Sequence, residues 1–394
     1  MGRRRPFVRI AAHFGITPGA AAAIATMVSV GIGIGLLPPL LALTLSARGV
    51  PERMIGLLVA TIALSALVTT PFASRIAARF GTARTIAGST LVAAGIIPFA
   101  WVIRSLALMF PVVFVYGAAV TLCFVLSEYW INAVTPQKSR GFIMGLYATM
   151  LSIGFALGPG IIAVLGYTTI KPFIVGSVLF ALAGIPTIMA RNLSPDFSAG
   201  TRHKFLPFIF AVPAATFGVF VFAMGETSGF AFLPLWGQNL GFTPFVVPLL
   251  ASAMTLGNVL FQIPLGLLAD RFDKRIILLI CGFTGFAGIL AAWAVSASPA
   301  VLMAVLFVWG GVTGGLYTIG LAHLASRFSG SELANANAAF IFCYASGMLI
   351  GPLAVGDSLT RWPLSGFPLV LGVVFGAYVL ITAWRIAVSR MPPS

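Results

Sequence analysis

Residues 243–296 read TPFVVPLLASAMTLGNVLFQIPLGLLADRFDKRIILLICGFTGFAGILAAWAVS. Two apolar runs, 243–269 and 275–296, stand on either side of the charged stretch that begins at Asp270. A helix that crosses the ~30 Å apolar core of a bilayer needs about 20 apolar residues, and each run is at least that long. The stretch therefore predicts two membrane-spanning helices joined by a short polar loop.

The same alternation extends over the whole chain of 394 residues. Apolar residues make up 59% and charged residues only 8%, against roughly 25% charged in a soluble domain. A surface that faces water cannot be built from this composition, so we predict an all-α polytopic membrane protein with twelve transmembrane helices. The predicted helices cover residues 19–46, 53–74, 83–103, 106–134, 141–166, 170–190, 205–235, 243–269, 275–296, 299–326, 333–356 and 364–388.

Basic residues gather on one side of the predicted membrane protein. The net charge is +15, and eighteen of the 23 Lys and Arg residues fall on the side of the chain ends when the helices are threaded alternately across the membrane. The five on the other side are Arg48, Arg53, Arg104, Lys171 and Arg361. Positive residues resist translocation, so this bias predicts cytoplasmic chain ends and explains the charge without a nucleic-acid partner.

An internal repeat divides the chain into halves, at an offset of 192 to 193 residues. The matched positions are Gly49 with Gly241, the loop of Arg79 with the loop of Arg271, and Gly154-x3-Gly158-Pro159 with Gly347-x3-Gly351-Pro352. The offset equals six helices, so we predict two six-helix bundles, 1–190 and 205–394, joined by a polar cytoplasmic connector, 191–204. Parallel repeats of this kind place a central cleft where the halves meet, and rocking the halves opens it to one side at a time.

The loop after the eighth helix carries the sharpest motif, which runs from Gly266 through Asp270, Arg271 and Lys274 to Arg275. A glycine lets two helices approach closely, and a carboxylate at the helix end can pair with arginine or cap a neighbouring helix. Contacts made in only one conformation are what a gate latch requires. The alternative is that these basic residues only anchor a cytoplasmic loop.

This motif resembles the signature of the major facilitator superfamily, Gly-x-Leu-Ala-Asp-Arg-x-Gly-Arg-Arg. The copy here departs from it by Asp273 in place of the second Gly and by Lys274 in place of Arg. In the first half the equivalent stretch keeps Arg79 and Gly81 but has Ala78 in place of the acid, so a latch is less well supported there. The resemblance implies the fold of that superfamily and a transporter in the bacterial inner membrane.

A second motif lies in the fifth helix and consists of Gly145-x8-Gly154-x3-Gly158-Pro159. Small residues on one helix face permit tight packing, and a proline weakens the local hydrogen-bond ladder. The motif resembles the antiporter signature of the superfamily, although the two further glycines of that signature are Ile162 and Ala163 here. Close packing without antiport is the alternative.

Two further segments bear on the kind of transporter. A drug and proton antiporter of the superfamily would carry an Arg in the fourth helix, and no Arg or Lys stands between Ser105 and Leu126. The segments 127–132 and Gly225-Glu226 are instead similar to a poorly characterised bacterial branch of the superfamily.

Acids within the membrane are expensive and are expected to face a cavity or a partner, because a charge at the bilayer centre costs ~2.5 to 3.5 kcal/mol on insertion scales. Glu226 lies close to the midplane beside small residues, so we predict that it contacts protons or substrate, with a structural hydrogen bond as the alternative. Glu128 lies about 9 Å from its helix end, where it is equally suited to a gate pair with Arg79 or Arg140 or to substrate contact. His323 is placed nearer the helix end, where it either reaches the membrane interface or, if buried, handles protons.

Polar side chains recur at helical spacing on three helices and predict faces turned to the cleft or to another helix. They are Thr26 and Ser29 with Gly33 on the first helix, Thr121, Glu128 and Asn132 on the fourth, and Thr255, Asn258 and Gln262 on the eighth. In the superfamily the first, fourth, seventh and tenth helices line the cavity, so the resemblance places the first two stripes and Glu226 there. The alternative for all three stripes is ordinary hydrogen bonding between helices.

These features favour a proton-coupled exporter of a small organic or amphipathic solute that works as a monomer. A proton symporter that imports a small metabolite is the nearest rival, and the absence of Lys or Arg at midplane disfavours strongly anionic substrates. A membrane enzyme or receptor-like sensor is disfavoured, since the sequence has neither a nucleotide-binding or His-Glu-x-x-His motif nor a soluble domain. We expect no cofactor and no metal, and the separated Cys123, Cys281 and Cys343 are interpreted as core packing.

Overall fold

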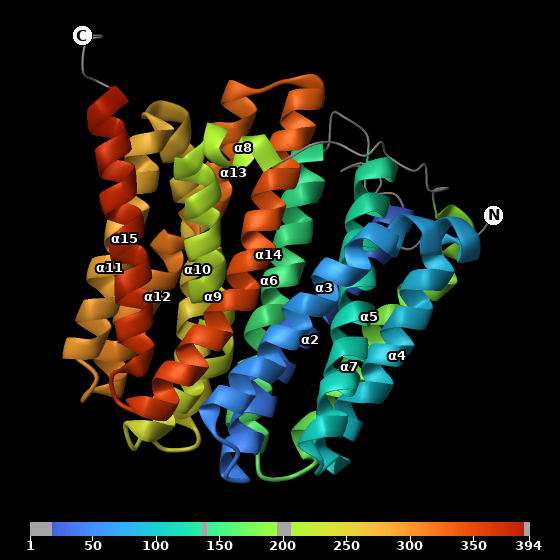
Figure 1. Ribbon diagram of the computed structural model, residues 1–394. Helices are drawn as coiled ribbons and strands as arrows, with labels where there is room; N and C mark the ends of the chain where they lie inside the picture. Colours follow the sequence, from blue (N-terminus) through green and yellow to red (C-terminus); the bar gives the residue numbers. More distant parts are fainter. Residues whose placement is uncertain (1–17, 136–139, 195–205, 390–394) are drawn as a thin grey trace, which may run out of the picture. The chain divides into compact units, whose positions relative to one another are not determined.

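The computed structural model describes residues 18–135, 140–194 and 206–389, and every regular element in this part of the chain is a helix. The helices are α2 (Pro18–Ala47), α3 (Glu52–Phe80), α4 (Thr82–Val102), α5 (Leu106–Val134), α6 (Arg140–Leu165), α7 (Lys171–Met189), η2 (Arg191–Leu193), α8 (Leu206–Ala211), α9 (Pro213–Asn239), α10 (Val246–Arg271), α11 (Lys274–Ala294), α12 (Pro299–Thr313), α13 (Gly315–Arg327), α14 (Gly330–Arg361) and α15 (Gly366–Ser389) (Figure 1).

The helices match the predicted transmembrane segments. Within the described ranges, eleven helices are long and apolar enough to cross a membrane, with α12 and α13 together forming one span. The shorter apolar stretch Thr149–Leu165 of α6 provides the twelfth segment. The predicted all-α membrane fold is therefore confirmed.

Two predicted helices are interrupted. The predicted seventh helix, 205–235, is split at Val212, whose φ of −134° and ψ of 60° separate the short α8 from α9 (Figure 1). The residue before a proline is pushed out of the helical region, and Pro213 follows directly. The predicted tenth helix, 299–326, is divided into α12 and α13 at Gly314, against which the side chain of Asn258 packs.

The chain forms two compact units that do not follow a single cut in the sequence. One unit comprises residues 1–37 and 64–200, and the other comprises 38–63 and 201–394. The end of α2 and the beginning of α3 therefore belong with the second unit. The division into bundles 1–190 and 205–394 stays a prediction, and most of the connector 191–204 lies outside the described residues.

In the first unit, the glycine signature of α6 packs against α2. A Cβ built on Gly154 would lie 2.5 Å from the carbonyl oxygen of Val28 and 2.7 Å from the Cα of Gly31. One turn further, a Cβ on Gly158 would overlap the backbone at Gly35. Only glycine permits the two helix backbones to come this close. The helical backbone of Gly145 is described, but its surroundings lie outside the described part.

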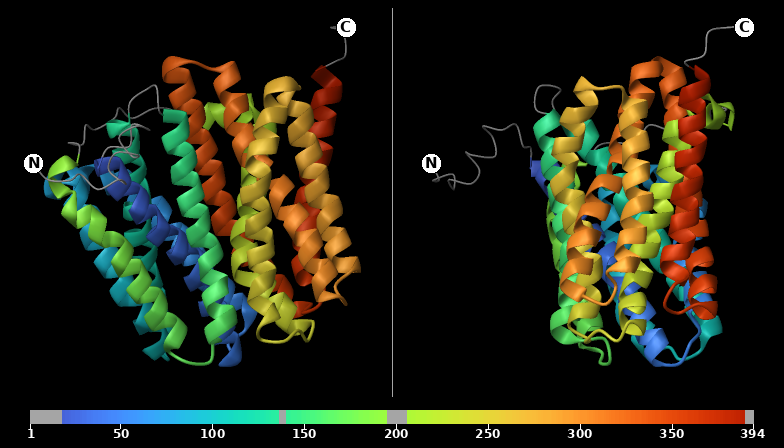
Figure 2. Two further views of the ribbon diagram at one scale, coloured as in Figure 1. Left: turned by 180° about the vertical axis from the view of Figure 1, so that it is seen from behind. Right: turned by 90° about the vertical axis from the view of Figure 1, so that its left-hand side faces the viewer.

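The matching glycines in the second unit pack α14 against α9 in the same way. A Cβ on Gly347 would lie 2.9 Å from the Cβ of Ala223 and would overlap the carbonyl oxygen of Phe220. A Cβ on Gly351 would lie 2.8 Å from the Cα of Met224. The sequence repeat therefore corresponds to a repeated helix contact, and Figure 2 shows α9 and α14 running along each other in the second unit.

The first helix of each half also ends in the same way. Gly49 and Gly241 have φ of 78° and 82°, in the left-handed region that glycine adopts at little cost. The N–H of Gly49 donates to the carbonyl of Ser46 at 2.9 Å, and that of Gly241 donates to Gln238 at 3.0 Å. The following residue in each case donates to the carbonyl five residues back, which completes a Schellman cap.

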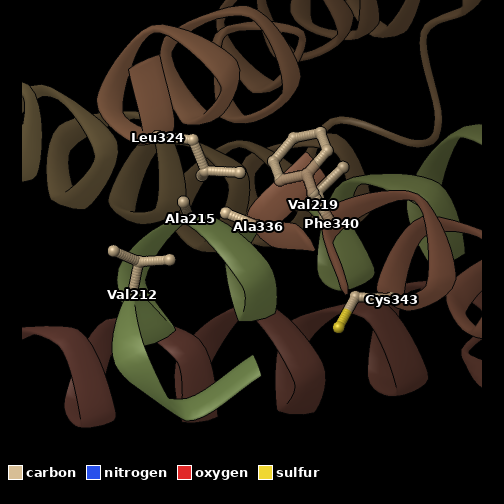
Figure 3. Close-up of a cluster of buried hydrophobic side chains, with 7 residues drawn as sticks. All are labelled: Val212, Ala215, Val219, Leu324, Ala336, Phe340 and Cys343. Atoms are coloured by element: carbon tan, nitrogen blue, oxygen red, sulfur yellow. The ribbon is translucent and has the colours of Figure 1, made fainter. Parts of the chain in front are cut away.

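A hydrophobic cluster fixes the start of α9 against α13 and α14 (Figure 3). It consists of Val212, Ala215, Val219, Leu324, Ala336, Phe340 and Cys343. All three cysteines are free and buried, as predicted. The cluster anchors the start of α9, the helix that carries Glu226 in its middle.

Candidate transport site

Glu226, in the middle of α9, receives a short hydrogen bond from α14. The hydroxyl Oη of Tyr344 donates to Glu226 Oε2 at 2.6 Å. Both residues are half-buried, so the described chain does not enclose the pair fully. The carboxyl group in the middle of α9 therefore has one fixed partner, which comes from another helix.

Aromatic rings surround this pair. The rings of Tyr317 and Tyr344 have centroids 5.6 Å apart, and that of Phe222 lies 6.2 Å from Tyr317 and 6.4 Å from Tyr344. Phe340 extends the group by an edge contact with Tyr317 at 5.5 Å. The rings of α9, α13 and α14 thus pack together beside one ionisable group, and those of Tyr317 and Tyr344 are partly exposed.

The position of Tyr344 depends on the glycine signature of α14. Tyr344, Gly347 and Gly351 are spaced by three and four residues, so they share one helix face. The two glycines bring that face onto the backbone of α9, which carries Glu226. Sequence analysis selected Glu226 but missed Tyr344, although this spacing was a usable signal.

The polar stripe of α10 bonds partly within its own helix and partly to a neighbouring helix. Thr255 is buried and donates to the carbonyl of Ala251 in its own helix at 2.8 Å. Gln262 Nε2 donates to Asn258 Oδ1 at 2.8 Å, and Thr318 Oγ1 of α13 donates to Gln262 Oε1 at 3.3 Å. Of the two alternatives left open for this stripe, the bond from Thr318 to Gln262 and the packing of Asn258 against Gly314 favour contact with another helix.

The stripe of α2 is buried against α7. Ser29 donates to the carbonyl of Phe180 at 3.0 Å, and the Thr26 and Thr187 hydroxyls share a hydrogen bond. Gly33 leaves room for the ring of Phe180. Both hydroxyl side chains are fully buried, so the contacts favour interhelical bonding over cavity lining.

On α5 the polar side chains bond within their own helix. Thr121 donates to the carbonyl of Gly117 at 2.8 Å, and Asn132 Nδ2 donates to the backbone carbonyl of Glu128 at 3.0 Å. Within the described part of the chain the Glu128 carboxylate makes no ion pair with Arg79, and the side chain of Arg140 lies outside that part. The gate and substrate roles of Glu128 both stay predictions.

His323 lies in α13 with only 7% of its surface exposed. This burial does not fit a side chain that reaches into the membrane interface. The carbonyl of His323 accepts a hydrogen bond from Ser326 at 2.8 Å. The charged groups near its ring are Asp273, Lys274, Arg275 and Arg327. Its role in proton handling stays a prediction.

The loop between α10 and α11 differs in part from expectation. A Cβ on Gly266 would meet no atom within 4 Å, so the expected close helix approach at this glycine is not found. Gly266 instead lines a groove of about 300 Å³ between α10 and α13. The side chain of Asp270 lies outside the described part, so the latch formed by Asp270 with Arg271, Lys274 or Arg275 stays a prediction.

Asp273, the departure from the signature, caps α11. Its Oδ1 accepts from the backbone N–H of Arg275 at 2.8 Å, and its Oδ2 lies 3.5 Å from the Arg275 guanidinium. At the matching turn of the first half, Gly81 starts α4 with φ of 86° and no capping side chain. The turn before α4 therefore has a glycine with positive φ, whereas the matching turn before α11 has a carboxylate that caps the helix.

Replacing Asp273 by alanine is expected to reduce the free energy of unfolding by about 1 kcal/mol at neutral pH, since an N-cap is lost. The hydrogen bond from the Arg275 N–H lowers the pKa of Asp273 below its ordinary value of 3.8. The cap therefore stabilises fully above that value, and its effect is lost as the pH falls through the lowered pKa. Thermal unfolding in detergent across this range checks the difference. Asp273→Asn, which keeps an acceptor, should lose less, and equal loss for both variants at every pH would contradict the capping role.

A second charged cluster lies at the opposite end of the helices, within the second unit. Asp357 of α14 pairs with Arg361 at 3.0 Å and with Arg53 of α3 at 3.8 Å. The backbone N–H of Arg53 donates to Thr360 Oγ1 at 2.9 Å. A Cβ on Gly356 would lie 2.6 Å from the carbonyl oxygen of Glu52, so the helices cross closely here. Sequence analysis missed this cluster, although Arg53 and Arg361 stood out among the five basic residues of the minority side.

The family is assigned by a match that extends over nearly the whole chain. The model of the Major Facilitator Superfamily matches residues 22–209 and 215–394. The chain therefore belongs to the Major Facilitator Superfamily and is a multi-pass membrane transporter. The resemblance seen in the sequence is confirmed.

Relatives and solved structures agree with this assignment. The chain is 24% identical to the uncharacterized MFS-type transporter YfkF of Bacillus subtilis (strain 168), over 92% of this chain and 93% of YfkF. It is 23% identical to multidrug resistance protein 2 of the same organism, over 71% of this chain and 73% of that protein. Among solved structures, the nucleoside transporter NupG has a TM-score of 0.72 at 15% identity, with 95% of this chain and 100% of NupG covered. A bacterial homologue of the human lysosomal transporter Spinster, in an inward-facing and unoccupied conformation, has a TM-score of 0.73 at 12% identity, with both chains fully covered. These likenesses show the fold.

Proposed function

We propose that this protein exports a small organic or amphipathic solute in exchange for protons, by alternating access, with Glu226 as the group that binds the proton. The observation that carries the proposal is the Glu226–Tyr344 hydrogen bond of 2.6 Å at a partly exposed carboxyl group within a span. A charge at such a depth is costly to maintain, and intramembrane acids are typical of proton relays. The Tyr344 hydroxyl donates to the ionised carboxylate, and protonation of the carboxylate removes the charge that strengthens this hydrogen bond.

The surroundings of Glu226 support an organic cargo. The partly exposed rings of Tyr317 and Tyr344 offer flat apolar contact, which suits an amphipathic molecule, and the buried ring of Phe222 packs beside both. No Lys or Arg lies in the middle of α9, α13 or α14, so an anionic cargo would have no counter-charge on these helices. The glycine signature of α6 and the similarity to multidrug resistance protein 2 of Bacillus subtilis favour export over import.

Alternating access requires contacts that form in one state and break in another. We place one gate at the loop from Asp270 to Arg275 and the other at the Arg53–Asp357 pair near the start of α3. These groups stand at opposite ends of their helices, as two gates must. The bias of basic residues supports cytoplasmic chain ends. We further propose that the protein works as a monomer in the inner membrane of a bacterium.

Reconstitution in liposomes tests this function. Purified protein is placed in vesicles that contain a pH-sensitive dye, and neutral, cationic and anionic organic compounds are added outside. For an antiporter, entry of a cargo must drive protons out, so the vesicle interior becomes more alkaline with neutral or cationic compounds and not with anionic ones. Cargo-dependent acidification would identify a symporter instead. Uptake of a labelled cargo without any proton movement would overturn proton coupling.

A further inference from the structure

A groove of about 510 Å³ opens in the first unit where the end of α3, the beginning of α4 and the middle of α5 meet. Arg79 and Arg84 line one end of this groove, on either side of the turn between α3 and α4. Val92 of α4 lies eight residues beyond Arg84, or about 12 Å further along the helix, and also lines the groove. The groove therefore has a cationic mouth at the helix ends and a long apolar body.

The body of the groove is lined mostly by small and apolar residues, with Thr85 and Ser89 as its polar lining residues. Gly88 lines it, and a Cβ built there would meet no atom within 4 Å, so its surface is open. Val115, Ala118 and Leu122 of α5 form the facing wall. Val92 and Val115 are each 46% exposed, which shows that no other part of the described chain covers this surface. In a membrane, a surface of this kind is in contact with lipid.

In the part of the chain that the structure describes, the charges at the mouth of the groove have no counter-charge. Within the described residues, neither Arg79 nor Arg84 lies within 4 Å of a carboxylate, and both are exposed. Arg79 instead lies over the ring of Phe80, at 5.4 Å from its centroid. The acid that the superfamily signature carries at this position in the second half, Asp270, is Ala78 in the first half. The first half therefore keeps the arginine of the signature but not the acid.

We propose that this groove binds one anionic phospholipid, with its phosphate on Arg79 and Arg84 and an acyl chain along Gly88 and Val92. Guanidinium groups bind phosphate by charge-assisted hydrogen bonds, which are stronger than neutral ones. Basic groups at the membrane surface attract anionic lipids, which are abundant in the cytoplasmic leaflet. A site for free phosphate needs only the two arginines. This groove also has a mostly apolar surface that extends about 12 Å along α4, where part of an acyl chain can lie. The inference requires only that the protein lies in a membrane, so it is independent of the proposed cargo.

Native mass spectrometry of the protein in detergent tests this inference. Phosphatidylglycerol and phosphatidylcholine with identical acyl chains are added to the wild type and to the double variant Arg79→Gln/Arg84→Gln. We expect the wild type to retain phosphatidylglycerol in preference and the double variant to bind it about tenfold less tightly or worse, because two charged hydrogen-bond donors are lost. The double variant Arg104→Gln/Lys171→Gln removes the same charge from exposed positions at the other end of this unit and should bind phosphatidylglycerol as the wild type does.

The body of the groove is tested separately. Gly88→Phe fills the open space without changing the charge and should also weaken binding of phosphatidylglycerol, while thermal unfolding shows that the variant is folded. Equal retention of the two lipids by the wild type, or unchanged retention of phosphatidylglycerol by both variants, would overturn the proposal. Displacement of phosphatidylglycerol by inorganic phosphate at equal concentration would also overturn it, since the acyl chain would then contribute nothing. Displacement by an amphipathic compound that the protein transports would assign the groove to cargo instead.

Discussion

Replacing Glu226 by glutamine is expected to lower the initial rate of cargo movement driven by a pH gradient by at least about tenfold. Glutamine keeps the size and can still accept the hydrogen bond from Tyr344 Oη, which is 2.6 Å from Glu226 Oε2 in the wild type. It has no proton to release, so the coupling step is lost while the packing of α9 on α14 is kept. Exchange of cargo across vesicles at equal pH should continue, because the amide resembles the protonated carboxyl group.

Two further variants separate coupling from general damage. Tyr344→Phe removes the hydrogen bond and leaves the carboxyl group, so proton-driven flux should persist with a changed dependence on pH. Glu332→Gln removes an exposed carboxylate from the first turn of α14 and should leave flux unchanged. Unchanged proton-driven flux in the Glu226 variant would remove this residue as the coupling site. Loss of both driven flux and equal-pH exchange would assign it to cargo contact alone.

A large loss of stability is expected from Gly158→Ala in α6. A Cβ at this position would lie 2.5 Å from the carbonyl oxygen of Gly35, and closer still to backbone atoms that no rotamer change can move aside. Insertion of a methyl group into a packed contact costs 1 to 3 kcal/mol and occasionally more, and a backbone obstacle places this variant at about 3 kcal/mol or above. The two helices must separate, so the midpoint of thermal unfolding in detergent should fall strongly.

Gly160 provides the matched control, two residues along the same helix. A Cβ there would meet no atom within 4 Å, so Gly160→Ala should leave the midpoint unchanged or slightly raised. Where Gly158→Ala yields too little protein to purify, the amount of folded protein in membranes, measured by fluorescence of a fused reporter, gives the same comparison. Equal stability of the two variants would contradict the close contact between α6 and α2.

The helices themselves were predictable from hydropathy, whereas their interruptions were not. The apolar runs matched the observed spans because every segment that crosses a bilayer must satisfy the same length and polarity. The break at Val212 had a local signal in Pro213 that was overlooked among apolar neighbours. The break at Gly314 coincides with the contact to Asn258, so it depends on how α10 packs on α12 and α13.

The candidate site was predicted in part. Glu226 was found because a carboxylate in an apolar run is rare, and its partner Tyr344 was missed because aromatic residues are common in this chain. Ser29 was placed on a polar face correctly, but periodicity identifies a face and not its neighbour. Its bond to the carbonyl of Phe180 arises from packing of α2 on α7.

By itself the sequence determined that the protein lies in a lipid membrane and how many spans it has, and of what length. It also determined the family and which acids lie within the membrane. These properties follow from single residues or single segments, because each segment must by itself be long and apolar enough to cross the bilayer. Only the tertiary structure decided which residues became partners, namely Tyr344 with Glu226 and Asp357 with Arg53, and that Arg79 and Arg84 line one groove. Such pairs join segments that are distant in the chain or direct side chains into a common space, and both depend on contacts between helices that no single segment encodes.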